Sequence, residues 1–80
     1  MKLTPIASNM TQIESGPVTV LFSYKTPVAA HIEGQGYYRT EHKWSSTTSR
    51  HINKWLIANG ARDPKTVPQP FFDTLLQVNA

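Results

Sequence analysis

Between Lys43 and Leu56 the chain reads KWSSTTSRHINKWL, in which five consecutive hydroxyl residues, Ser45–Ser49, precede Arg50 and His51. The amide groups at the start of a helix have no partner within the helix, and Ser or Thr side chains cap them at a value of about 1 kcal/mol. The same amides, lined with hydroxyls and followed by cations, also suit a phosphate or carboxylate. Since the glycine-rich loop of a P-loop is absent, the run favours a helix start, with an anion site as the alternative.

Cationic and aromatic residues alternate in and around this stretch. Arg50 and Lys54 are four residues apart on one helix face, and Arg39 and Lys43 precede them. Cations neutralise phosphates and aromatic rings stack on bases, as in proteins that bind single strands. The alternative is a solvated cationic helix face, with Trp44, Trp55 and one tyrosine in the core. The candidate binding residues are Tyr37, Arg39, Lys43, Trp44, Arg50, His51 and Lys54.

Catalytic and metal-binding patterns are weak. His31, His42 and His51 form no closely spaced pair and the chain has no cysteine, so no metal site or cofactor is predicted. Glu41 and His42 could join one of the hydroxyls as acid, base and nucleophile, but no Gly-x-Ser-x-Gly elbow is present. We therefore expect a protein that is not an enzyme and has no catalytic residue.

Length and composition predict a single domain over residues 1–80. The chain is 39% hydrophobic and 16% charged, and its formal charge of +3 permits a polyanionic partner without requiring one. No window reaches the about 18 apolar residues needed to cross a bilayer, and the first residues do not resemble a secretory signal. We therefore expect no membrane association and a cytoplasmic location.

Alternating apolar residues at Val18–Tyr24 predict a strand, and Met10–Glu14 could pair with it. Val28–Ile32 and Tyr37–His42 flank a loop with two glycines, which predicts a hairpin. The spacing of Ile52, Trp55 and Leu56 indicates an amphipathic helix from about Thr48 to Ala58, ended by Asn59-Gly60.

The prolines of residues 61–70 predict a linker before the C-terminal segment, and Phe71–Val78 follows as a short helix, with a strand as the alternative. The expected fold class is α+β. It consists of an antiparallel meander of three to four strands packed on one amphipathic helix, with a short C-terminal helix.

Two stretches, Leu21–Trp44 and Ser45–Leu56, resemble a family of small uncharacterised proteins found in tailed bacteriophages, prophages and plasmids. The matching residues are Phe22, Ser23, Tyr24, Thr26, Val28 and Ala29, followed by Trp44, Ser45, Thr47, Thr48, Ser49, His51, Ile52 and Asn53. The resemblance covers about half of the chain and leaves out the first 15 residues and the proline-rich tail.

This resemblance implies a phage or mobile-element accessory protein that acts in the cytoplasm of a bacterial host, with no reaction, cofactor or binding residue to transfer. Small phage proteins commonly occupy a host protein's surface, so the expected function is to bind and modulate a host protein or a defence complex, CRISPR systems included. The alternative is a nucleic-acid-binding protein that uses Arg39, Lys43, Arg50 and Lys54. The oligomeric state is not predicted.

Overall fold

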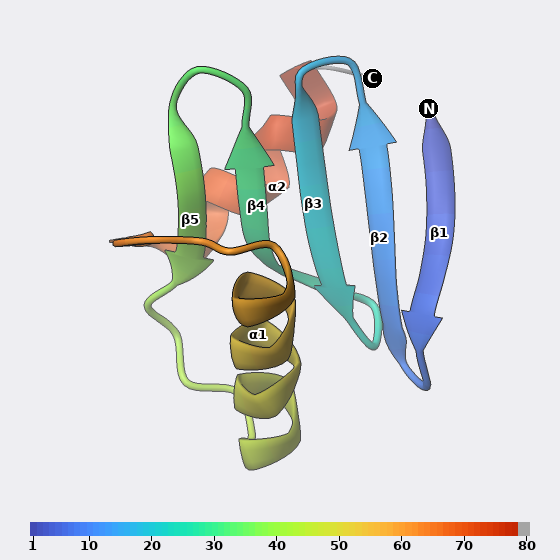
Figure 1. The fold of residues 1–80 in the computed structure, drawn as a ribbon, viewed down its shortest axis with the longest axis vertical. Helices are drawn as coiled ribbons and strands as arrows, with labels where there is room; N and C mark the ends of the chain where they lie inside the picture. Colours follow the sequence, from blue (N-terminus) through green and yellow to red (C-terminus); the bar gives the residue numbers. More distant parts are fainter. Residues whose placement is uncertain (79–80) are drawn as a thin grey trace.

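The protein contains one six-stranded sheet with a helix on each face (Figure 1). This computed structural model describes residues 1–78. The strands are β1 (Lys2–Ala7), β2 (Met10–Ser15), β3 (Val18–Ser23), β4 (Thr26–Ile32), β5 (Gly36–Thr40) and β6 (Lys65–Val67). The helices are α1 (Ser46–Ala58) and α2 (Gln69–Val78). Strands β1 to β5 form an antiparallel meander in chain order, and β6 pairs parallel to β5 at the edge.

Tight turns with left-handed residues connect the first four strands. Asn9, Gly16 and Tyr24 have φ values of 59°, 58° and 58°. Two-residue hairpin turns demand such angles, which glycine and asparagine adopt at little cost. Tyrosine rarely does, so Tyr24 is the unusual residue of the three. Its backbone amide donates to the Asn9 carbonyl at 2.7 Å, which ties the two neighbouring turns together.

Helix α1 begins at the hydroxyl run, as the sequence predicts. The Ser45 side chain accepts a hydrogen bond from the Thr48 amide at 3.1 Å, which makes Ser45 the N-cap. At the other end Gly60 has a φ of 66°, and the amides of Gly60 and Ala61 donate to the carbonyls of Ile57 and Leu56. This pair of bonds is the Schellman arrangement that ends a helix.

Apolar residues fill two cores, one on each face of the sheet. On one face, Leu21 and Val28 pack with Ile52, Trp55 and Leu56 of α1. The residues on the other face are Val18, Val20, Ala30, Tyr38 and Phe72, the last from α2. A bulge at Leu21/Phe22 in the pairing of β3 with β4 lets Val28 join Ala29 in the α1-side core. The two helices therefore bury opposite faces of one sheet.

The α+β class is confirmed, but the prediction of three to four strands is wrong. Strand β1 was not expected, and three residues of the predicted linker form β6. The prediction also placed one helix against the sheet, whereas α2 covers the second face. Neither helix in the described part of the chain has the length and apolar character needed to cross a bilayer. The last two residues of the predicted domain, 79 and 80, lie outside the description.

Candidate binding site around Trp44

The loop between β5 and α1 presents a tryptophan to solvent. The alternative that Trp44 belongs to the core is wrong, because 45% of its surface is exposed, whereas Trp55 is buried as expected. The Trp44 Nε1–H group donates to the Gln69 side-chain oxygen at 3.2 Å. Its ring lies against that of His42, with the centroids 4.2 Å apart. Trp44 is thus exposed to solvent and also held in position.

Gln69, the first residue of α2, anchors this loop by side-chain hydrogen bonds. Its Oε1 atom also accepts from the hydroxyl of the buried Thr40 at 2.8 Å, and its Nε2 donates to the Pro27 carbonyl at 2.6 Å. These bonds connect β4, β5, the loop and α2 at one point. The position of Trp44 therefore depends on a residue 25 positions further along the chain.

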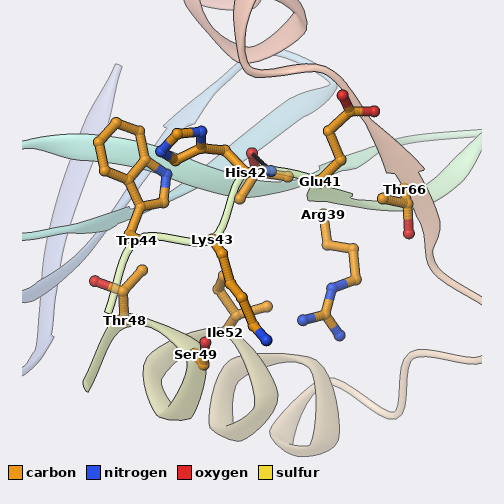
Figure 2. A pocket seen from close by; sticks show the side chains of 10 residues that line it. Arg39, Glu41, His42, Lys43, Trp44, Thr48, Ser49, Ile52 and Thr66 are labelled. Atoms are coloured by element: carbon orange, nitrogen blue, oxygen red, sulfur yellow. Dashed lines mark hydrogen bonds between the residues drawn. The ribbon is translucent and has the colours of Figure 1, made fainter. Parts of the chain in front are cut away.

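Arg39 and Lys43 share a cavity of about 270 Å³ beside Trp44. Figure 2 shows both side chains pointing toward α1, whereas Glu41 points away from it. The Arg39 Nη1 atom donates to the Asn53 side-chain oxygen at 3.4 Å, so its partner is neutral. Within residues 1–78, neither Arg39 nor Lys43 forms an ion pair. The cavity therefore holds two cations without ion-pair partners, and the carboxylate of Glu41, which also lines it, points away from them.

Two further hollows adjoin the same tryptophan. One, of about 410 Å³, is lined by Lys43, Trp44, Ser45, Ser46 and Ser49. The other, of about 220 Å³, is lined by Ser23, Tyr24, Thr26, Trp44, Ser45 and Thr48. The smaller hollow joins residues from both stretches that carry the sequence resemblance. Trp44 lines all three cavities and is the centre of the candidate site.

A buried hydroxyl network fastens the start of α1 to the end of β3. The Ser23 hydroxyl lies 3.0 Å from the Thr48 hydroxyl and 2.8 Å from His51 Nδ1. The second distance suits a nucleophile and its base, but only 1% of Ser23 is exposed. The Tyr24 ring also contacts the His51 ring, with centroids 6.1 Å apart. This geometry suits a structural tie between the two elements.

The seven candidate binding residues do not form a single surface. Arg39, Lys43 and Trp44 lie together around the cavities. Arg50 and Lys54 are on the exposed outer face of α1 and line none of these cavities. The remaining two take part in contacts within the fold, because Tyr37 packs edge-on against Trp55 and His51 bonds to Ser23.

The roles of Ser23 and Gln69 were not predicted from the sequence. Both act through partners at least 25 residues away, and their local surroundings read only as a strand and a proline-rich segment. The left-handed backbone conformation of Tyr24, which follows Ser23, was not predicted either. In the described residues, no group of three or more His, Asp or Glu side chains could hold a metal ion.

The fold and the site together define a small α+β domain with an exposed tryptophan beside a cationic cavity. A family of unknown function (DUF8033) matches residues 1–73, and the chain therefore belongs to that family. The match includes the first 15 residues and the proline-rich segment, which the sequence resemblance left out. Comparisons with curated proteins and with solved structures gave no match.

Proposed function

We propose that this protein is a non-enzymatic accessory protein of a phage or mobile element. In this proposal it binds and modulates a protein of the bacterial host or of a defence complex, CRISPR systems included, in the host cytoplasm. The phage origin rests on the sequence resemblance. The observation that supports binding is the exposed Trp44, held by Gln69 and by the His42 ring.

A fixed surface tryptophan is a good anchor for a partner protein. Tryptophan and arginine are enriched among the residues that dominate binding energy, and Arg39 lies beside Trp44 in the same cavity. Binding costs about 0.5–1.5 kcal/mol for each flexible side chain that must be ordered. Because Trp44 is already ordered, it would contribute contact area without most of that cost.

The outer face of α1 can extend this anchor into a full interface. Ile57 is 79% exposed on that face, and Arg50 and Lys54 accompany it. Neither cation forms an ion pair with another described residue. A standard interface covers about 800 Å² on each partner. The loop and the helix face together offer a surface of mixed aromatic, apolar and cationic character, which suits a protein with an acidic binding surface.

The absence of catalysis is part of the proposal and is supported by the burial of Ser23. A nucleophile must reach its substrate, but the Ser23 hydroxyl is enclosed between Thr48 and His51. The cavities around Trp44 are open and lined mainly by hydroxyls and cations. Such a surface binds a partner more readily than it excludes water from a reaction.

Affinity capture from a bacterial lysate tests this function, with the protein immobilised as wild type, Trp44→Ala and Leu3→Ala. Leu3 is a matched control because it is also exposed and apolar, but lies on β1. We expect a partner that wild type and Leu3→Ala retain and Trp44→Ala loses, and that also binds when both proteins are purified. A partner retained equally by Trp44→Ala, or recovery of the free protein alone, would contradict the proposal.

Nucleic-acid binding is the second candidate function. It is favoured by Arg39 and Lys43, which form no ion pair with another described residue and lie beside an exposed tryptophan. Phosphate contacts release counterions, so affinity should fall steeply between about 50 and 200 mM salt. Fluorescence anisotropy of labelled single-stranded DNA, duplex DNA and RNA measures this. Arg50→Ala and Lys54→Ala should lower the affinity for nucleic acids of every sequence by the same factor. No binding at low salt would eliminate this function.

A further inference from the structure

We propose that the surface around Trp44 is a nucleotide site, in which a base stacks on the Trp44 ring and its phosphate lies between Arg39 and Lys43. This inference rests on the second candidate function and specifies its chemistry. It assigns the recognition of one nucleotide to three residues within a six-residue segment. Arg50 and Lys54, on the outer face of α1, would add only long-range electrostatic attraction to this site.

The phosphate half of the site is the cavity of about 270 Å³. Arg39 and Lys43 extend into it from β5 and the loop, toward the side of α1 that carries Ser49 (Figure 2). The bond to Asn53 holds the guanidinium group without neutralising it, because the acceptor is an amide oxygen. A guanidinium group recognises phosphate oxygens in bidentate geometry, and an ammonium group adds a point charge. Thr48 and Ser49 of α1 line the same cavity, but the Thr48 hydroxyl is bonded to Ser23, so only Ser49 is a candidate hydroxyl donor to the phosphate.

The base half of the site is the neighbouring hollow of about 410 Å³, which Trp44 lines together with Lys43 and three serines. Every base has a π-face, so stacking on an exposed aromatic ring tolerates any sequence. The hydrogen bond to Gln69 and the contact with His42 fix the Trp44 ring before any ligand arrives. A fixed ring loses little freedom on stacking, which favours binding.

The two halves are adjacent, because both cavities are lined by Lys43, Trp44 and Ser49. A ligand that fills both must combine a flat aromatic group with an anion a short distance away. A nucleoside monophosphate has this form, whether it is free or one unit of a single strand. The two sources share the same chemistry and differ in the charges that flank the unit.

Proton–nitrogen NMR tests whether the site binds a nucleotide, with the two indole N–H signals as reporters. Trp55 is an internal control, because it is buried, lines none of these cavities, and its Nε1–H group donates to Gln12 of β2 at 2.9 Å. Adenosine monophosphate should shift the Trp44 signal in a saturable way, with a Kd of about 1 mM, and leave Trp55 unchanged. Adenosine alone and inorganic phosphate alone should each bind about tenfold more weakly.

Matched variants separate the two halves. Lys43→Met should lower the affinity for adenosine monophosphate about tenfold and leave the affinity for adenosine unchanged. Lys2→Met, the same substitution on β1, should change neither affinity. Trp44→Ala should lower the affinity for both ligands about tenfold. Binding to this variant is followed through the backbone amide signals of Ser45 and Ser49. The inference is wrong if adenosine monophosphate does not shift the Trp44 signal. It is also wrong if Lys43→Met lowers the affinity for adenosine monophosphate no more than Lys2→Met does.

A thymidine oligonucleotide then identifies the source of the nucleotide. Binding about tenfold tighter than that of the monophosphate, with a steeper salt dependence, supports a strand. If the oligonucleotide and the monophosphate bind with equal affinity, the ligand is a free nucleotide. Oligonucleotide binding that Trp44→Ala leaves intact would refute the inference while the second candidate function survives. If oligonucleotides fail to bind and the monophosphate binds, the second function fails and the nucleotide site remains.

Discussion

Replacement of Gln69 by alanine is the sharpest test of how the fold holds the loop around Trp44. The substitution removes three hydrogen bonds, which join Gln69 to Thr40, to Trp44 and to the Pro27 carbonyl. A hydrogen bond contributes about 0.5–1.5 kcal/mol net, and more when its loss leaves a buried group without a partner. Water can replace Gln69 at the exposed Trp44, so the loss comes mainly from Thr40 and Pro27.

Two such bonds correspond to about 2 kcal/mol of the free energy of unfolding. A domain of this length is expected to have about 4–12 kcal/mol in total, so the variant should remain folded at 25 °C. Because 1 kcal/mol changes Tm by about 4–8 °C in a domain of this size, Tm should fall by about 8–16 °C. Trp44 should also become more mobile, because its indole N–H group has no other hydrogen-bond partner among the described residues.

Urea unfolding followed by circular dichroism measures the free energy of unfolding, and relaxation of the Trp44 indole N–H signal in proton–nitrogen NMR measures the mobility of Trp44, with Trp55 as the internal reference. Thr74→Ala is the matched control, since Thr74 is an exposed residue of α2 whose hydroxyl bonds only within its own helical segment. We expect this control to stay within about 0.5 kcal/mol of wild type. If Gln69→Ala is no more destabilising than Thr74→Ala, Gln69 does not anchor the loop.

Three other substitutions test the parts of the fold that support the site. Ser23→Ala removes bonds to Thr48 and His51 and should cost about 1–2 kcal/mol in urea unfolding; an unchanged midpoint would contradict a structural tie. Gly60→Ala should cost about 1–2 kcal/mol by the same measurement, from its positive φ alone, because an added Cβ would meet no atom within 4 Å. Phe72→Ala should cost about 3–5 kcal/mol, because Phe72 is fully buried in the α2-side core, and thermal unfolding that still matches wild type would refute this.

Local patterns predicted the elements whose own residues carry the signal. Helix α1 has apolar residues at helical spacing, with hydroxyls at its start and Asn59-Gly60 at its end, and the structure has the helix within two residues of the prediction. Strands β2 to β5 were also recognised from alternation and turn residues. Strand β1 was missed because its sequence, KLTPIA, has no apolar alternation to detect; all of its residues except the half-buried Thr4 are exposed.

Strand β6 was missed for a different reason. Its three residues, KTV, lie between Pro64 and Pro68, and local propensity there favours a linker. They become a strand only because α1 carries the chain back to the edge of the sheet, where Lys65–Val67 pair parallel to Tyr38–Thr40. Such a pairing joins segments separated by a whole helix, and no short window of sequence contains it.

Arg39, Lys43 and Trp44 lie within six residues of one another, so they are close in any fold and their proximity can be read from the chain. The burial of Trp55 also follows from its helical spacing, but the exposure of Trp44 became clear only from the folded structure. Each tryptophan follows a lysine, but Trp44 precedes Ser45-Ser46 whereas Trp55 precedes Leu56-Ile57. The difference arises because α1 turns Trp55 toward the sheet, whereas α2 docks on the opposite face and brings Gln69 to the Trp44 indole.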